Sequence, residues 1–184
     1  MLFYLKKHIV LELSVTLILG GIGWLGIRYF EISVDLSPSI SVLFWAAVGA
    51  AALAVWTLLV QSGYALVCGR EYAVGLTKSL ASQFEQASMV QVIGALFAAA
   101  GEEVFFRGFI QGQWGLLAGS VAFMLAHIGK RDIRVIGYWS IFQGLALGII
   151  YLLSGNLLVP MLSHGLFDMG AMAYFRVFMA KRSS

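Results

Sequence analysis

From residue 40 to residue 67 the sequence contains no charged side chain and only a few polar ones. A helix needs about 20 mostly apolar residues to cross the hydrocarbon core of a bilayer, and this run exceeds that length. The whole chain shares this character, with 60% hydrophobic residues, only 11% charged residues and a mean hydropathy of +0.89. Soluble domains carry about 25% charged residues. The sequence therefore predicts an integral membrane protein and excludes a soluble enzyme and a disordered chain.

Charge and cysteine content narrow the class further. The 12 basic and 9 acidic residues leave a net charge of +3, too small for a phosphate-binding face, so no nucleic-acid partner is expected. The single cysteine, Cys68, excludes an intramolecular disulfide and a cysteine-based zinc site. A length of 184 residues predicts one domain.

The apolar runs predict an all-α fold, a polytopic transmembrane bundle of about six spanning helices. The spans are predicted at residues 10–30, 40–67, 90–111, 116–128, 135–153 and 157–175. Residues 76–89 fit either an interfacial amphipathic helix or a plain loop.

The positions of Lys and Arg predict the orientation of these spans. Ten of the 12 basic residues fall at one set of helix ends, Arg28 alone falls at the opposite ends, and Arg107 lies inside a span. Basic residues favour the cytoplasmic side of a membrane. We therefore expect a multi-pass protein of a prokaryotic plasma membrane with both termini in the cytoplasm.

Several ionisable side chains fall inside the predicted spans of the second half, where each costs about 2.5–3.5 kcal/mol to insert. They are Glu102, Glu103, Arg107, His127, His164 and Asp168. This cost predicts mutual pairing or a water-filled cavity. Glu103 and Arg107 are spaced i,i+4 and should form an ion pair, which leaves Glu102 as the candidate for chemistry. His164 and Asp168 share a helix face for the same reason.

Counting residues from the predicted turns places the polar groups at one depth in the membrane. Glu102 lies 13 residues before the turn at Gly115 and His127 lies 12 residues after it, so both are ~18 Å from that turn. Asp168 lies 13 residues past Gly155 in the second turn on the same side. Charges with scattered structural roles need not share a depth. We therefore expect one polar site, nearer the cytoplasmic surface.

Three short motifs, each within a predicted span, carry a family resemblance. Residues 102–107 read E-E-x-x-x-R, residues 123–127 read F-x-x-x-H, and residues 164–168 read H-x-x-x-D. The stretch 142–148 adds a weaker glycine-rich motif. Over residues 90–175 the chain resembles the CPBP family of CAAX proteases and bacteriocin-processing enzymes, also called Abi, which includes the type II CAAX prenyl endopeptidases.

The resemblance implies an intramembrane endopeptidase that cuts near the C-terminus of a membrane-associated protein or peptide. It assigns Glu102 as the catalytic glutamate and His127 as the partner that activates water. It assigns His164 and Asp168 to the support of the oxyanion. The family carries Asn or Asp at the last position, and an ionised Asp168 cannot donate a hydrogen bond. Asp168 therefore either orients His164, keeps it protonated, or acts as a neutral acid.

Alternatives stay open for the cofactor and for the function. Glu102, His127, His164 and Asp168 could together bind a divalent metal such as zinc, but H-E-x-x-H is absent and we favour a metal-free site. The rival function is a non-catalytic membrane immunity protein or a small transporter that uses the same polar residues.

The expected partners are the lipid bilayer and a substrate within or attached to it. The substrate is a lipidated protein, a bacteriocin precursor or a protein with a C-terminal sorting helix, and the sequence does not choose among them. Phe123, Phe142 and Gln143 are interpreted as packing residues.

Overall fold

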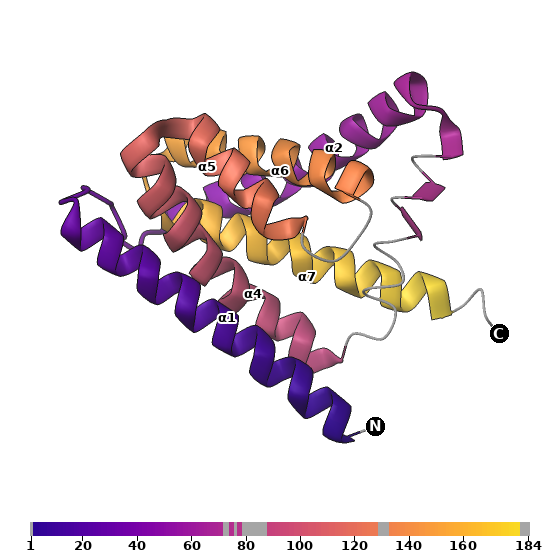
Figure 1. Cartoon of the computed structure of the whole chain (residues 1–184), viewed down its shortest axis with the longest axis horizontal. Helices are drawn as coiled ribbons and strands as arrows, with labels where there is room; N and C mark the ends of the chain where they lie inside the picture. The colour runs from indigo at the N-terminus through magenta and orange to yellow at the C-terminus, as the bar shows by residue number, and fades with distance from the viewer. Residues whose placement is uncertain (1, 72–73, 76, 79–87, 129–132, 181–184) are drawn as a thin grey trace.

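The computed structural model describes residues 2–71, 74–75, 77–78, 88–128 and 133–180. Within these residues the chain is built from helices and contains no β-strand, which confirms the predicted all-α class (Figure 1). The elements are α1 (Leu2–Tyr29), α2 (Ile40–Val67), α4 (Met89–Glu103), the π-helix η1 (Val104–Gln111), α5 (Gly112–His127), α6 (Ile133–Ser154) and α7 (Leu158–Ala180). Most of the segment 76–89, predicted as an interfacial helix or a loop, lies outside the described residues.

Serine residues begin two of the long helices. Ser39 caps α2, and its hydroxyl accepts a hydrogen bond from the backbone N–H of Val42 at 3.3 Å. Ser88 begins α4 with a capping box, in which its hydroxyl accepts from the Gln91 N–H while the Gln91 side chain accepts from the Ser88 N–H. Caps of this kind satisfy amide groups that have no partner within the helix.

Two helical stretches among the described residues are long and apolar enough to cross a membrane. They are Ile40–Val67 and the continuous run Met89–His127, while Leu13–Tyr29 and Trp139–Ser154 are shorter apolar stretches. The run Met89–His127 contains two of the predicted spans. Its helical backbone is interrupted at Gly115, where φ is +88° and ψ is 174°. The predicted break near Gly115 is thus confirmed. The chain is a membrane protein, and the count of six spans stays a prediction.

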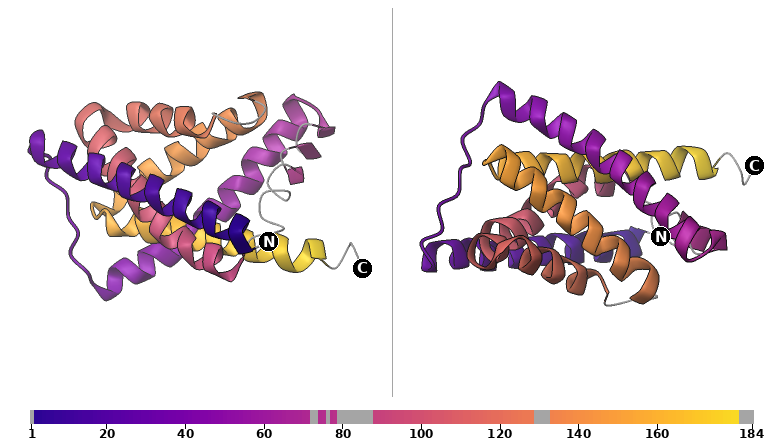
Figure 2. Two further views of the ribbon diagram at one scale, coloured as in Figure 1. Left: turned by 60° about the horizontal axis from the view of Figure 1, so that its bottom comes forward. Right: turned by 90° about the horizontal axis from the view of Figure 1, so that it is seen from above.

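Helix α7 lies in the middle of the bundle, packed between α2 on one side and α4 on the other. Helix α1 covers the outer face of α4 and η1, and α5 packs against η1 and α6 (Figure 2). The two chain ends lie toward the same end of the bundle (Figures 1 and 2). The polar residues of interest come from α4, η1, α5 and α7, which all meet around this centre.

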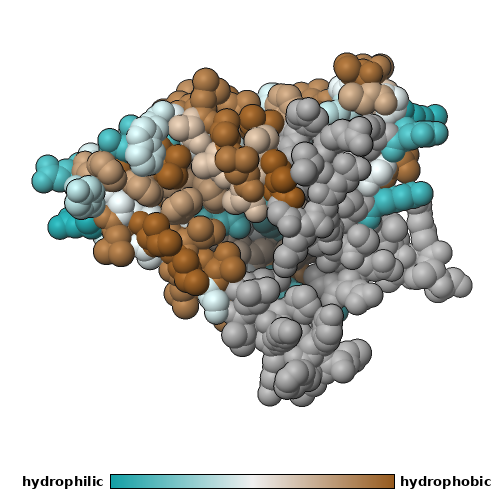
Figure 3. Space-filling view, in the orientation of Figure 1, coloured by the Kyte–Doolittle hydropathy of each residue, from teal (hydrophilic) through white to brown (hydrophobic). Residues whose placement is uncertain are grey.

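The surface is apolar where a soluble protein would be polar. On α2, Leu43, Phe44 and Leu58 are each more than 60% exposed, whereas the small Ala46 faces the interior and is 1% exposed. Figure 3 shows hydrophobic residues across the middle of one face and hydrophilic residues gathered toward its two ends. Large exposed apolar patches are rare on soluble monomers, so this surface fits a lipid environment.

Candidate active site

The centre of the site depends on a close approach between α7 and α4. A Cβ atom on Gly165 would lie 2.9 Å from the Cα of Leu96, so only glycine allows the two helices to come this near. On α7, the neighbouring Ser163 donates a hydrogen bond to the carbonyl of Ala46 at 3.2 Å, which fixes α7 against α2. Small residues at such contacts let helix backbones pack closely in membranes. This packing brings His164 against α4.

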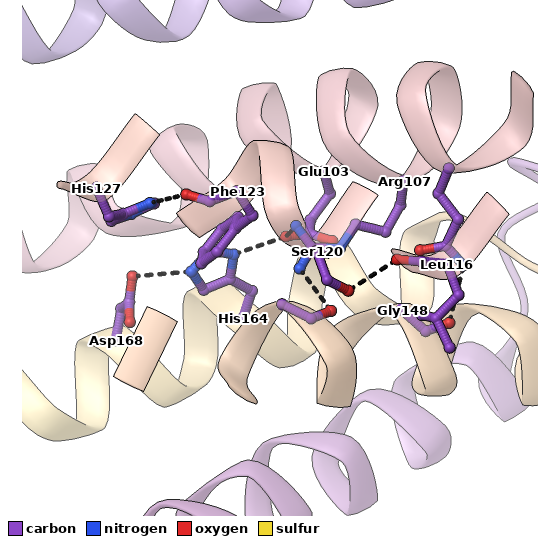
Figure 4. Close-up of polar contacts among 11 residues, drawn as sticks. Glu103, Arg107, Leu116, Ser120, Phe123, His127, Gly148, His164 and Asp168 are labelled. Carbon is purple, nitrogen blue, oxygen red and sulfur yellow. Dashed lines mark hydrogen bonds and ion pairs between the residues drawn. The ribbon is translucent and has the colours of Figure 1, made fainter. Parts of the chain in front are cut away.

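Glu103 and Arg107 form the predicted i,i+4 ion pair, with 3.0 Å between Arg107 Nη1 and Glu103 Oε1. Both side chains are 0% exposed. The same Glu103 Oε1 also accepts a hydrogen bond at 2.8 Å from Nδ1 of His164, 61 residues away in the sequence (Figure 4). The pairing is therefore confirmed, but the link to His164 was not predicted. In the sequence, the only indication of the link to His164 was that Glu103 is a second carboxylate next to Glu102.

The π-helix η1 is a feature that the sequence analysis missed. It aligns two buried donors, Arg107 and Gln111, with carbonyls four residues apart on α6: Arg107 donates to Gly144 at 3.2 Å and Gln111 to Gly148 at 3.0 Å. A Cβ on Gly144 would lie 3.0 Å from the Cα of Ser120, which explains the glycines of the 142–148 motif as contact positions. Short π-helices occur often at functional sites.

His164 and Asp168 lie on one face of α7, as predicted, with 3.4 Å between Nε2 and Oδ2. The side chain of His164 is 9% exposed and that of Asp168 is 30% exposed. Figure 4 shows a row that runs from Arg107 through Glu103 and His164 to Asp168. Its Arg107 end is sealed from solvent and its Asp168 end is partly open.

His127 reaches this row through Phe123. Its Nδ1 donates to the carbonyl of Phe123 at 2.8 Å, and because a carbonyl only accepts, Nδ1 carries the proton and Nε2 is left for other partners. The ring centroids of Phe123 and His127 lie 4.3 Å apart with 31° between the ring planes, and the Arg107 guanidinium lies 4.5 Å from the centre of the Phe123 ring. Among the described residues His127 forms no hydrogen bond with the other candidate side chains, but it interacts electrostatically with Asp168.

Glu102 has a different environment from its neighbour Glu103. Its side chain is partly exposed, and within the described part of the chain it forms no hydrogen bond or ion pair. It interacts electrostatically with Arg107, His164 and Asp168. The structure therefore joins His164 and Asp168 directly and places Glu102 and His127 in electrostatic range of them, without direct contact among all four.

The structure brings the four residues considered as metal ligands only partly together. In the described ranges no group of three or more His, Cys, Asp or Glu side chains is arranged to hold a metal ion. Nδ1 of His164 faces Glu103, and Nδ1 of His127 faces a backbone carbonyl.

Phe142 and Gln143, interpreted as packing residues, connect α6 to α2. Trp56 donates its indole N–H to the Phe142 carbonyl at 2.9 Å, and the Gln143 amide donates to the hydroxyl of Thr57. Gln143 is 4% exposed. These contacts fix α6 against α2.

One family model matches the chain. Residues 85–170, just under half of the sequence, match a family described as type II CAAX prenyl endopeptidase Rce1-like. The matched segment contains α4, η1 and α5 and every candidate residue described above. Neither curated proteins nor solved structures gave a significant match.

Proposed function

We propose that this chain is an intramembrane endopeptidase of the CPBP family of CAAX proteases and that it uses a glutamate-activated water, because residues 85–170 match the type II CAAX prenyl endopeptidase Rce1-like family. The observation that carries the proposal is the family match over the one segment that gathers two histidines and three carboxylates inside a lipid-facing bundle. Groups of this kind in a membrane interior usually mark a functional site.

Glu102 is the proposed general base. It is the carboxylate of the pair without a partner among the described residues, whereas Glu103 is occupied by Arg107 and His164. In the proposed reaction Glu102 takes a proton from water while the water oxygen bonds to the carbonyl carbon of the substrate. His127 orients that water through Nε2, because its Nδ1 proton is committed to the Phe123 carbonyl. A positioned base contributes roughly 10²–10⁴-fold to such a step.

His164 and Asp168 are proposed to support the oxyanion. When the water adds, the carbonyl oxygen of the substrate gains negative charge, and a donor on the Nε2 side of His164 stabilises it. The carbon–nitrogen bond then breaks, and the proton held by Glu102 passes to the departing amine. A single oxyanion donor is worth about 2.7–4 kcal/mol in enzymes of known mechanism.

The proposed substrate is a membrane-associated protein or peptide cut near its C-terminus. The exposed apolar side chains of the bundle favour a substrate that arrives within the lipid layer rather than from water. A lipidated C-terminus, a bacteriocin precursor and a C-terminal sorting helix all satisfy this requirement. A substrate complex trapped on the inactive Glu102→Ala protein, analysed by mass spectrometry, would identify the substrate.

The proposal is tested with the full chain purified into lipid nanodiscs and a fluorogenic membrane peptide. We expect Glu102→Gln to lower turnover by at least about 100-fold, as for loss of a general base. Glu71→Gln, a change at an exposed carboxylate outside the site, is the matched control and should cleave normally. Turnover should persist in strong chelator, since the proposed chemistry uses no metal.

Two results would count against the proposal. Normal turnover by a folded Glu102→Gln protein would show that another group is the base. A folded wild-type chain that hydrolyses none of the three peptide classes would favour the non-catalytic immunity or transport function instead.

A further inference from the structure

Glu103 stands at the centre of the polar row although the proposed reaction assigns it no step. Its Oε1 accepts from Arg107 Nη1 at 3.0 Å and from His164 Nδ1 at 2.8 Å. The Glu103 side chain is 0% exposed, so water does not compete for this oxygen. One buried acceptor therefore connects the ion pair of α4 and η1 to the histidine of α7.

We propose that Glu103 is a positioning residue that accepts the Nδ1 proton of His164 and thereby directs the Nε2–H of the doubly protonated ring into the reaction space. This inference rests on the proposed function, since it concerns how the oxyanion donor is oriented. Glu103 then has a role beyond its ion pair with Arg107, because that ion pair by itself does not require His164.

The direction of the hydrogen bond follows from the shared oxygen. Arg107 has only donors on its guanidinium, so the oxygen that it faces acts as an acceptor. The same Oε1 lies 2.8 Å from His164 Nδ1, and Nδ1 must then supply the proton of that hydrogen bond. With Nδ1 protonated, Nε2 is the nitrogen that is free to change its protonation state.

The two nitrogens of His164 face different surroundings. Nδ1 points to the fully buried Glu103, whereas Nε2 points to Asp168, whose side chain is 30% exposed. Glu102 of α4 and His127 of α5 are the other titratable groups in electrostatic range of this open side. Chemistry at His164 therefore takes place on the Nε2 side, and Glu103 fixes which nitrogen lies there.

The edge of Phe123 restricts the ring further. The centroids of Phe123 and His164 are 5.8 Å apart at an angle of 60°, and Phe123 is 2% exposed. A ring held by a hydrogen bond at Nδ1 and by an aromatic neighbour cannot flip without breaking both contacts. Orientation of a catalytic imidazole by a buried carboxylate is worth up to about 10⁴-fold in turnover in serine proteases.

The first test is made on the wild-type protein without substrate, and one variant serves only to assign the signals. The chain contains three histidines, so selective ¹⁵N-histidine labelling gives a spectrum with few signals, and His164→Asn identifies those of His164. We expect Nδ1 of His164 to be protonated and hydrogen-bonded in the wild-type protein in nanodiscs. A wild-type spectrum with an unprotonated Nδ1 overturns the inference.

The second test separates positioning from the ion pair. In the double variant Glu103→Leu with Arg107→Met, both buried charges leave together, a change that many proteins tolerate without loss of stability. We expect a folded protein in which the Nδ1 signature of His164 is lost and kcat falls by about 100-fold or more, with KM within about 3-fold. Wild-type kcat in this folded variant overturns the inference.

Glu103→Gln is the conservative counterpart. Its amide oxygen can still accept from Arg107 and His164, so the Nδ1 signature should persist and kcat should fall less than in the double variant. If the double variant does not fold, this comparison decides: loss of the Nδ1 signature in Glu103→Gln, with the wild-type signature present, contradicts the assigned hydrogen bond.

Failure of the proposed function gives a different pattern from failure of this inference. If the wild-type chain cleaves no peptide but shows a protonated Nδ1, the protease proposal fails while the Glu103–His164 bond stands. If the chain cleaves in a Glu102-dependent way but Nδ1 is bare, the protease proposal stands and the role of Glu103 is refuted.

Discussion

Asp168 is the residue whose chemical role the sequence left most open. Its position i,i+4 from His164 predicted that the two share a face, and the structure places Oδ2 3.4 Å from Nε2. The structure adds that Glu103 already holds the other nitrogen of this ring. A second carboxylate is therefore not needed to orient His164, and the partly exposed position of Asp168 suits a neutral carboxylic acid that donates its O–H to the substrate oxyanion.

Asp168→Asn should accordingly be tolerated. An amide of the same shape can donate a hydrogen bond to the oxyanion, so we expect the kcat of Asp168→Asn to lie within about 10-fold of the wild type. Asp168→Leu removes the donor, and its kcat should fall by about 100-fold or more. Steady-state kinetics on both folded variants measure this difference. If Asn is as damaging as Leu, the site requires an anion at this position and the oxyanion role is wrong.

At the level of single residues, local spacing could be predicted and contacts between helices could not. The Glu103–Arg107 pair follows from i,i+4 geometry, which any helix imposes. The bond from Glu103 to His164 joins residues 61 apart and depends on how α7 packs against α4, which no local pattern encodes. Phe123 was predicted as a packing residue and is buried; its contact with His127 also follows from i,i+4 spacing, but its contact with Arg107 appears only in the folded bundle.

Among the elements, helix positions were predictable because a helix exposed to lipid must consist mostly of apolar residues, so each apolar run marks a helix. The run at residues 40–67 corresponds to α2, and the predicted span 90–111 corresponds to α4 and η1 together. The π-helix itself was not predicted, because i→i+4 and i→i+5 hydrogen bonding leave similar apolar patterns over eight residues. The final helix also extends further than predicted, to Ala180 instead of residue 175.

Glycine positions determine how closely these helices pack. A Cβ on Gly23 of α1 would lie 2.7 Å from the Cα of Phe105, a backbone atom that cannot rotate away. Gly21, two residues away on the same helix, has nothing within 4 Å of such a Cβ. The two glycines thus provide a matched pair of contact and non-contact positions.

Gly23→Ala should push α1 away from η1. We expect a loss of stability of about 1–3 kcal/mol, as for overpacking elsewhere, and a lower kcat because Phe105 lies two residues from Glu103. Gly21→Ala should be neutral or slightly stabilising, since alanine is the better helix former. Thermal unfolding in detergent and peptide cleavage measure both effects. Equal behaviour of the two variants would mean that α1 does not pack closely on η1.

On the scale of the whole molecule, the first two helices are separated rather than paired. α1 covers α4 and η1, whereas α2 packs on α7 and α6, so α4 and α7 lie between them (Figure 2). Neighbouring apolar runs in a sequence suggest an antiparallel pair, and no local pattern predicts the separation. The connecting segment passes the turn between α6 and α7 and bonds to it there.

Two hydrogen bonds join these loops, and we call the pair the latch. Leu157 N–H donates to the Asp35 carbonyl at 2.8 Å, and the Asn156 amide donates to the Ser37 carbonyl at 3.0 Å. Hydrogen bonds from the hydroxyl and backbone N–H of Ser37 hold the pKa of the Asp35 carboxyl below its usual range. A lowered pKa in the folded state adds stability above the unfolded pKa, and this contribution disappears as the pH falls through the folded value.

Asn156 has two functions in this latch, and substitution can separate them. Its Oδ1 accepts from the Leu158 N–H at 2.9 Å and caps α7, while its Nδ2 reaches Ser37. Asn156→Ser keeps a capping oxygen and loses the hydrogen bond to Ser37, whereas Asn156→Ala loses both side-chain hydrogen bonds. At about 0.5–1.5 kcal/mol per hydrogen bond, we expect stability to fall in the order wild type, Ser, Ala, with kcat at low temperature unchanged because the turn is remote from His164. Thermal unfolding in nanodiscs, with cleavage measured well below the transition, checks this order. If Asn156→Ser is as stable as the wild type, the hydrogen bond from Asn156 to Ser37 contributes nothing to the arrangement of α1 and α2 that forms the site, and helix packing with the backbone bond from Leu157 to Asp35 maintains it.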